Sequence, residues 1–262
     1  GMVCKESHRC PEHGYRFPTE VDKAGRCTVC GTPVEVGRTE KMSKSKRNVV
    51  DPDELLSQYG ADTIRLFSLF AAPPEKDLEW SDDGVQGAFR FLNRVWRLME
   101  ERAASVRACG RDGWSAAEPE AAVRALRRIT HQTIAKVTRD MEDAFHFNTA
   151  IAALMELAGA LGRFQEQLPP PAERPGAVSD RELAFAEAAR TLVVMLAPFA
   201  PHVAEELWEM LGGRESVFRQ SWPAADAALA AEDSLEIVVQ VNGKVRGRLQ
   251  VPRGTPEAEL RS

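Results

Sequence analysis

The sequence predicts a mainly α-helical protein built around a helical bundle. This prediction rests on long segments with apolar residues at helical spacing. Short polar loops join these segments, and no strands lie between them. The first 40 residues are rich in turn formers and have no helical period, so we expect a small, irregular, cross-linked module there. Near the other end, Asn242-Gly243 between two alternating segments predicts a tight β-hairpin.

Two short helices are expected directly after the N-terminal module (residues 1–40). Asp51 is a suitable N-cap and Pro52 suits the first helical position, while Gly60 is a natural stop. A second apolar helix follows over residues 62–72 and ends at Pro73-Pro74.

Five longer amphipathic helices should form the bundle. The first begins near Ser81 and has a predicted apolar face of Val85, Phe89, Leu92, Trp96 and Met99. The second spans residues 123–141, and the third starts from Asn148 as N-cap and runs through Leu161 to the loop Pro169-Pro170-Pro171. The fourth opens with a capping box at Ser179–Glu182 and ends near residue 197, and the fifth covers residues 203–211.

The hairpin is expected over residues 235–241 and 244–251. A lone hairpin is only marginally stable in water, and eleven residues follow Val251, so we interpret this segment as the start of a truncated α/β domain. The chain also begins with Gly1 and not with an initiator Met. Both ends therefore suggest a fragment of a longer protein.

Composition excludes several classes of protein. Of 262 residues, 44% are hydrophobic and 28% are charged, with a net charge of −5, as expected for one or two globular domains. No segment approaches the roughly 20 apolar residues of a membrane span, and the N-terminus lacks the apolar core of a signal peptide. We expect a cytoplasmic protein that does not contact a membrane.

Four residues of the N-terminal module have the spacing of a zinc site. Cys10 and His13 form C-x2-H, and Cys27 and Cys30 form C-x2-C, so each pair suits two adjacent positions of a tetrahedral zinc. Gly31 would let the second pair turn. Such a closed site would be structural, although Cys4 or His8 could replace a ligand and the thiols could also be unligated.

Residues 38–47 form a strongly basic stretch with a local excess of four positive charges. Within it lies Lys41-Met42-Ser43-Lys44-Ser45, which we call the lysine loop. A given pentapeptide of this kind occurs by chance in about 1 in 10,000 chains of this length, so a purely solvated loop is the weaker interpretation.

The lysine loop resembles the KMSKS motif of class I aminoacyl-tRNA synthetases. The resemblance extends over essentially the whole chain. The chain looks most like the bacterial leucyl-tRNA synthetases, in residues 41–53, 59–67, 72–81, 91–96, 147–151, 197–202 and 241–247. The valyl, isoleucyl and methionyl enzymes share the motif and a similar bundle. Leu78-Glu79-Trp80-Ser81 and the hairpin sequence favour the leucyl family.

The resemblance implies a part of a leucine–tRNA ligase, which joins leucine to tRNA(Leu) through leucyl-adenylate with ATP and Mg²⁺. Lys44, supported by Lys41, would contact ATP as a catalytic residue; Met42 would pack, and Ser43 and Ser45 would shape the loop. Two lysines that close over ATP would stabilise the negative charge of the phosphates and the departing pyrophosphate. No histidine lies in a His-Ile-Gly-His type motif, so we expect ATP and leucine to bind only together with a separate N-terminal catalytic domain, and the fragment to be inactive alone.

The family also implies four parts and a monomer. Residues 1–40 would be a zinc-knuckle-like insert next to the catalytic domain, and residues 41–80 would hold the lysine loop and stem-contact helices. Residues 81–225 would form the anticodon-binding-type helical bundle, and residues 232–262 the truncated start of a C-terminal tRNA-binding domain. There, Lys244, Arg246 and Arg248 alternate along one strand, so we expect them to share a face that contacts tRNA.

Basic residues of the bundle are open to two interpretations. They either lie on solvated helix faces or contact tRNA phosphates without recognising bases. They are Arg90, Arg94, Arg97, Arg124, Arg127, Arg128, Lys136 and Arg139.

Two other functions remain open. One is a noncatalytic tRNA-binding adaptor, which has no chemical need for an intact lysine loop. The other is a different class I ligase with a branched-chain substrate.

Overall fold

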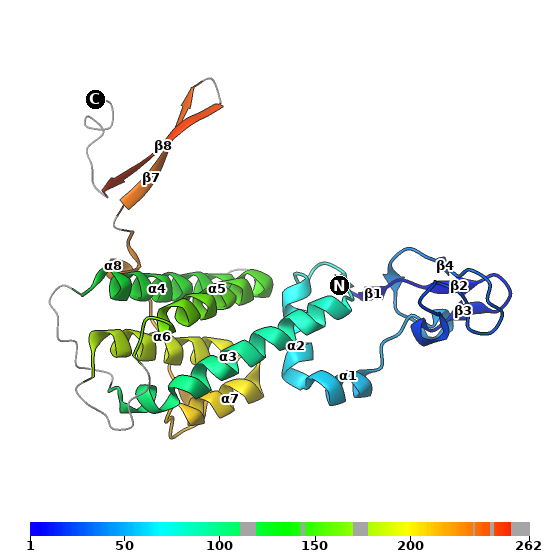
Figure 1. Cartoon of the computed structure of the whole chain (residues 1–262), viewed down its shortest axis with the longest axis horizontal. Coiled ribbons are helices and arrows are strands. Elements are labelled where there is room, and N and C mark those ends of the chain that lie inside the picture. Colours follow the sequence, from blue (N-terminus) through cyan, green and yellow to red (C-terminus); the bar gives the residue numbers. More distant parts are fainter. Residues whose placement is uncertain (111–118, 143–144, 170–177, 233, 242–243, 253–262) are drawn as a thin grey trace.

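The computed structural model describes residues 1–110, 119–142, 145–169, 178–232, 234–241 and 244–252, with backbone alone for most of the last two strands. Figure 1 shows a small β-rich module at one end, helices through the middle and a hairpin that projects from the helical body. The predicted mainly helical fold is therefore confirmed, and the helices carry the core.

Two small three-stranded sheets organise the N-terminal module. In the first, β1 (Val3–Lys5) lies between β5 (Glu40–Lys41), to which it is antiparallel, and β6 (Leu78–Glu79), to which it is parallel. In the second, β2 (His8–Cys10) lies between β3 (Gly14–Arg16) and β4 (Glu35–Val36). These strands have two or three residues each, too few for a period in the sequence to reveal them.

Two short helices connect the module to the bundle. In α1 (Pro52–Tyr59), Asp51 caps the first turn by accepting a hydrogen bond from the Asp53 backbone N–H at 2.9 Å, as predicted. Gly60, with a φ of 77°, separates it from α2 (Ala61–Ala71). The Arg65 guanidinium of α2 donates to the Pro198 carbonyl at 2.9 Å, which fixes these helices to the bundle.

The bundle consists of α3 (Asp82–Ala108), α4 (Ala121–Glu142), α5 (Phe147–Gln165), α6 (Asp180–Leu196) and α7 (Pro201–Met210). Helix α4 packs on both α5 and α6, and α3 packs on α2, α6 and α7 (Figure 1). The predicted capping box at Ser179 and Glu182 is present. Leu154, Leu157 and Leu192 are fully buried, so the apolar faces form one continuous core.

Two details of the bundle differ from the sequence prediction. Phe89 is 39% exposed, whereas Phe91 is 3% exposed, so the buried face of α3 includes Phe91 instead. Helix α5 begins at Phe147 with His146 as N-cap, and not after Asn148. The end of α4 sets this start, because the Asp140 carbonyl accepts from the His146 N–H at 2.8 Å and the Asp140 carboxylate accepts from the Thr149 hydroxyl at 2.6 Å.

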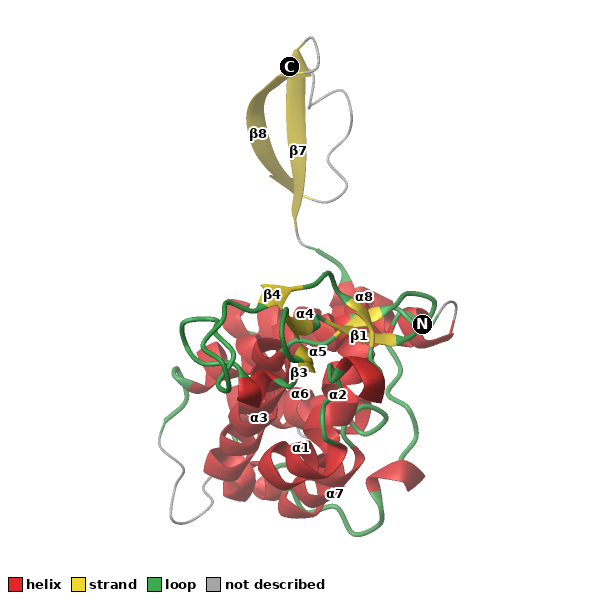
Figure 2. Cartoon of the chain, turned by 90° about the vertical axis from the view of Figure 1, so that its right-hand side faces the viewer, coloured by secondary structure: helices red, strands yellow, loops and turns green. Residues whose placement is uncertain are grey.

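The C-terminal segment leaves the bundle through η3 (Val217–Arg219) and the single-turn helix α8 (Ala227–Ala230). The predicted hairpin is formed by β7 (Ser234–Val241) and β8 (Lys244–Pro252), which pair antiparallel and stand clear of the helices (Figure 2). The turn expected at Asn242-Gly243 lies outside the described residues. The pairing register shifts between Val239 and Gln240.

No helix in the described part of the chain is both long and apolar enough to cross a membrane.

A partly buried ionic cluster holds α4 against α6. The Arg127 guanidinium donates to the Glu187 carboxylate at 2.8 and 3.2 Å, and His131 Nε2 lies 3.4 Å from the same carboxylate. His131 Nδ1 accepts from the Asp226 backbone N–H at 3.1 Å, so the ring proton lies on the nitrogen that faces Glu187. Burial raises the pKa of Glu187, but the His131 and Arg127 side chains outweigh burial and lower this pKa below its ordinary value.

We predict that Glu187→Gln lowers the free energy of unfolding by about 1–2 kcal/mol at pH 7. Because the folded-state pKa is lowered, this stabilisation is complete above the unfolded pKa of about 4.3 and is lost as pH falls through the folded pKa. Urea unfolding followed by circular dichroism at pH 7 and pH 3 should show the difference between the two proteins shrinking at pH 3. A difference that does not change with pH would contradict the role of the Glu187 charge.

Candidate functional site

The lysine loop leaves β5 and enters the short helix η2 (Lys44–Lys46). The Ser43 hydroxyl caps this helix by accepting from the Lys46 N–H at 3.3 Å, and it lies 3.1 Å from the Ser45 hydroxyl. The Met42 N–H donates to the Val3 carbonyl of β1 at 3.1 Å, and the Met42 side chain is half-buried. The loop backbone is thus held by its own serines and by β1.

Asn48, which was not predicted from the sequence, fixes the backbone of the lysine loop. Its side chain is 1% exposed; Oδ1 accepts from the Ser43 N–H at 2.8 Å and Nδ2 donates to the Lys5 carbonyl at 3.0 Å. One buried amide therefore joins the loop to β1. The only signal in the sequence is a polar residue placed between the basic stretch and the apolar pair Val49-Val50.

The cations of the basic stretch divide into two groups. The Lys46 ammonium pairs with the Glu40 carboxylate, and Arg47 pairs with Glu20 at 3.1 Å. Hydrogen bonds from Lys46 and Ser7 lower the pKa of Glu40 below its usual value, so Glu40 stays ionised. Lys41 and Lys44 are exposed and have no ion-pair partner within the described residues.

This division has a chemical consequence. Lys46 and Arg47 are already neutralised by protein carboxylates. The ammonium groups of Lys41 and Lys44, in contrast, have no ion pair among the residues that the structure describes, and they belong to a loop whose backbone is held in place. Such groups suit an anionic ligand, phosphate above all, because no carboxylate in the described part of the chain neutralises their charges.

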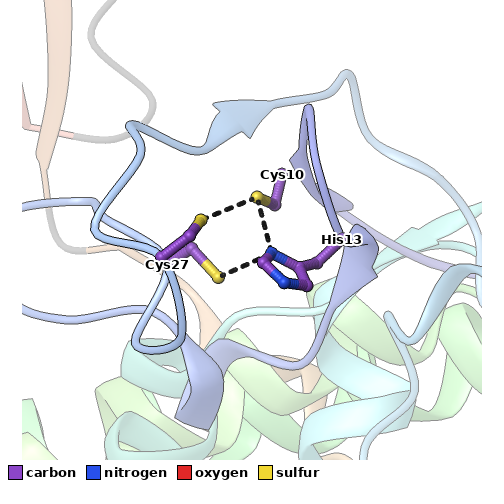
Figure 3. A group of neighbouring side chains, drawn as sticks. Cys10, His13 and Cys27 are labelled. Carbon is purple, nitrogen blue, oxygen red and sulfur yellow. Dashed lines mark hydrogen bonds between the residues drawn. The ribbon is translucent and has the colours of Figure 1, made fainter.

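The four predicted metal ligands come together in space. Cys10 Sγ lies 3.5 Å from Cys30 Sγ and 3.6 Å from His13 Nδ1, and Cys27 Sγ lies 4.0 Å from His13 Nδ1. All four ligand atoms lie within 4.8 Å of one another. Figure 3 shows Cys10 and His13, which belong to the β2–β3 hairpin, converging with Cys27 on one point.

These separations test whether zinc fits. Zn–S bonds of about 2.3 Å and Zn–N bonds of about 2.0–2.1 Å in a tetrahedron require ligand atoms about 3.5–3.8 Å apart. The separations that involve Cys10 agree with this range, and the one between Cys27 and His13 is close to it. Among the described residues, Cys4 and His8 do not belong to the cluster.

The turn that carries Cys27 and Cys30 depends on glycine. Gly31, predicted to let the second pair turn, has a φ of 72°, and its N–H donates to the Cys27 carbonyl at 2.8 Å. The backbone N–H groups of Cys30 and Val29 point at the Cys27 sulfur and lower the pKa of its thiol, which favours the thiolate that a metal binds.

The basic residues of the bundle do not form one uniform surface. Arg127 is engaged with Glu187, Lys136 pairs with Asp140 at 2.8 Å, and Arg124 donates to the Pro119 carbonyl at 2.6 Å. Three exposed arginines of α3 instead line one groove of about 900 Å³ without an ion pair in the described part of the chain; this arginine row is Arg90, Arg94 and Arg97.

The predicted contacts of the hairpin are described only in part. Arg246 is exposed, and the side chains of Lys244 and Arg248 lie outside the described residues. In the pairing register, Val239 faces Gly247 and Gln240 faces Val245, so the register passes over Arg246. The shared face of Lys244, Arg246 and Arg248 therefore stays a prediction.

Two family models match the chain. "Anticodon-binding domain of tRNA ligase" matches residues 124–261, and "tRNA synthetases class I (I, L, M and V)" matches residues 30–81, which include the lysine loop. The first match covers the last three helices of the bundle, most of α4 and the hairpin.

Similar proteins bear the same family name. The "Leucine--tRNA ligase" of Syntrophus aciditrophicus is 49% identical over 266 aligned residues, which cover 100% of this chain and 30% of that protein. That of Geotalea daltonii is 51% identical over 221 residues, covering 84% and 26% of the two chains. The solved ternary complex "LeuRS-tRNA-LeuAMS" of Agrobacterium radiobacter has a TM-score of 0.71 and 32% identity, over 84% of this chain and 26% of that one.

The chain thus spans about 30% of the length of the curated relatives that match all of it. The lysine loop and most of the bundle, from residue 124 onward, fall within matched regions. The chain belongs to the class I aminoacyl-tRNA synthetases, as a part of a leucyl-tRNA synthetase.

Proposed function

We propose that the chain supplies the ATP loop and the tRNA-binding bundle of a leucine–tRNA ligase, which forms leucyl-tRNA from ATP with Mg²⁺, leucine and tRNA(Leu). The observation that carries this proposal is the lysine loop, in which Lys41 and Lys44 are exposed and unpaired within the described residues while Lys46 and Arg47 are neutralised. The names of the relatives support the choice of leucine.

In this proposal, leucine attacks the α-phosphate of ATP, and negative charge develops on the phosphate oxygens and the departing pyrophosphate. Lys44 stabilises that charge as the first catalytic residue, and Lys41 assists it. Ser43 and Ser45 keep the loop in shape, and Met42 packs beneath it. The other groups that grip ATP and leucine belong to the N-terminal catalytic domain of the full-length enzyme.

The proposed division of the chain follows from these roles. Residues 1–40 form a zinc-binding insert, residues 41–80 the ATP loop with stem-contact helices, residues 81–225 the bundle, and residues 232–262 the start of a tRNA-binding domain. As the resemblance to the family implies, we propose that the enzyme acts as a cytoplasmic monomer.

We assign a structural zinc ion to Cys10, His13, Cys27 and Cys30, and the ligand separations support this assignment. Four protein ligands would close the coordination sphere and leave no position for a substrate. The metal would stabilise a module whose strands have at most three residues and which is too small for a core of its own.

The tRNA surface combines the arginine row with the hairpin. Arg90, Arg94 and Arg97 lie along one face of α3, exposed and without an ion pair among the residues that the structure describes, which suits successive phosphates. Lys244, Arg246 and Arg248 would extend this surface to a distant part of the tRNA. Both sets would bind the backbone and read no bases.

We predict that alanine at Lys244, Arg246 and Arg248 together weakens tRNA binding by the full-length enzyme and lowers the slope of log affinity against log salt by about 2–3. Filter binding at several salt concentrations measures this slope. Alanine at Arg9, Lys23 and Arg214, which are exposed outside the hairpin, serves as the matched control. An unchanged slope in the hairpin variant would exclude these phosphate contacts.

The proposal as a whole is tested by aminoacylation with the full-length protein. It should attach leucine to tRNA(Leu) and should fail to attach isoleucine or valine at comparable rates. A protein that binds tRNA(Leu) but charges it with nothing would be the noncatalytic adaptor, and charging with isoleucine or valine would identify a different branched-chain ligase.

A further inference from the structure

Arg47 has a backbone conformation that is rare for its residue type. It follows the lysine loop directly and ends η2 as its C-cap, with a φ of 52° and a ψ of 27°. A side chain in this left-handed region is unfavourable, and glycine is the residue that adopts it freely. The conformation therefore needs support from contacts of the Arg47 side chain.

Those contacts come from the N-terminal module. The guanidinium donates from Nη1 to both carboxylate oxygens of Glu20, at 3.1 and 3.3 Å, and it stacks over the Phe17 ring at 5.1 Å from the centroid. Phe17 and Glu20 belong to one short element, because the Phe17 N–H donates to the Glu20 carboxylate at 2.9 Å. We call the contact of Phe17 and Glu20 with Arg47 the latch.

The latch is tied directly to the cysteine–histidine cluster. The Glu20 carbonyl accepts from both the backbone N–H and the hydroxyl of Thr28, each at 3.1 Å. Thr28 lies between the ligands Cys27 and Cys30, so its position depends on the turn that the metal would hold. An unbroken series of contacts leads from the cluster through Thr28 and Glu20 to Arg47.

The latch is distinct from the other support of the loop. Asn48 joins the loop to β1, through the Ser43 N–H and the Lys5 carbonyl. The latch instead joins the loop to Phe17 and Glu20, which lie between the two ligand pairs in the sequence. The loop therefore has one anchor in the small sheet and another in the metal-binding part of the module.

We propose that the latch couples the metal-binding module to the ATP loop, with Arg47 as a positioning residue for leucine activation. The inference rests on the proposed function. When the cluster is loaded, Glu20 holds Arg47 and keeps the loop in the arrangement that presents Lys44; when the metal is lost, the loop loses this anchor. Because such coupling is reciprocal, releasing Arg47 also weakens metal retention.

The informative variant is Arg47→Gly in the full-length enzyme. Glycine adopts the observed φ without strain, so this variant removes the latch and leaves the loop backbone free to keep its conformation. We expect kcat for leucine-dependent ATP–pyrophosphate exchange to fall about fivefold or more, while KM for leucine stays within about twofold. Arg47→Lys should restore part of the rate, and Arg9→Ala, an exposed cation of the same module, should behave as wild type.

The second readout is metal release. With a chromophoric chelator under reducing conditions, Arg47→Gly and Glu20→Gln should each release zinc about fivefold faster than wild type and Arg9→Ala. Glu20→Gln also removes the ion pair between Glu20 and Arg16 at 3.0 Å. The double variant should therefore release zinc no faster than Glu20→Gln alone, because that change already breaks the contact with Arg47.

Several results would overturn the latch. One such result is an Arg47→Gly variant with the kcat and the zinc release of wild type. Another is an Arg47→Gly variant with slower exchange but unchanged zinc release, because Arg47 would then act within the loop alone. A wild-type enzyme without bound metal would remove the basis of the coupling. If wild type shows no leucine-dependent exchange, the proposed function fails instead, and the zinc-release comparison still tests the contact between the module and the loop.

Discussion

Lys44→Ala in the full-length enzyme should reduce leucine-dependent ATP–pyrophosphate exchange by at least about tenfold. Lys44 is exposed on η2 and has no carboxylate partner in the described part of the chain, so its charge is available to the nucleotide. At an effective dielectric constant near 20, two unit charges about 4 Å apart interact by about 4 kcal/mol. Since about 1.4 kcal/mol of transition-state stabilisation corresponds to a factor of ten, losing a fraction of this interaction is sufficient.

Two further variants serve as controls for the Lys44→Ala experiment. Lys23→Ala removes another exposed lysine of the chain, far from the motif in sequence, and should leave the exchange rate unchanged. Lys44→Arg keeps the charge and should lose less activity than Lys44→Ala. Near-normal exchange in Lys44→Ala would refute the role of this lysine in ATP chemistry.

Removing the metal should have the largest effect on structure. We expect about one zinc ion per chain in protein purified under reducing conditions, and Cys27→Ser should retain less than about 0.2, because a tetrahedral site loses most of its affinity with one thiolate. Structural zinc contributes about 10–16 kcal/mol of binding free energy in small modules, so residues 1–40 should lose their fold without it. Elemental analysis and hydrogen exchange over residues 1–40 measure the two effects.

Cys4→Ser is the matched control for the metal experiment. Cys4 is buried in β1, and among the described residues its sulfur is not part of the cluster. This variant should keep its zinc. Zinc loss in Cys4→Ser with retention in Cys27→Ser would reverse the assignment, and a wild-type protein with less than about 0.2 zinc per chain would reject the structural metal altogether.

Much of the fold could be predicted because its signals are local. The period of α4 and α6, the capping box at Ser179 and the hairpin flanking Asn242-Gly243 each depend on residues close together in the sequence. The sequence-based predictions were wrong where tertiary contacts determine where a helix begins or which of its residues is buried. Asp140 sets the start of α5 from another helix. Phe89 and Phe91 are both apolar and lie on different sides of α3, and packing buries only Phe91.

The candidate site shows the same limit. The motif and the cysteine spacing pointed to Lys41, Lys44 and the four cluster residues without any structure. What surrounds them could not be predicted, because Asn48 contacts Lys5 across 43 positions and Arg47 contacts Glu20 across 27. No local pattern in the sequence marks an asparagine as buried or an arginine as held in a left-handed conformation.

The position of β1 has a consequence for the order of folding. Val3 pairs with Leu78 in parallel, so the strand that supports the loop on one side waits for a partner some 75 positions later in the chain. The intervening chain includes α1 and α2, and closing so long a loop is slow compared with forming either helix. During synthesis, the ATP loop therefore acquires its complete frame only after β6 has emerged.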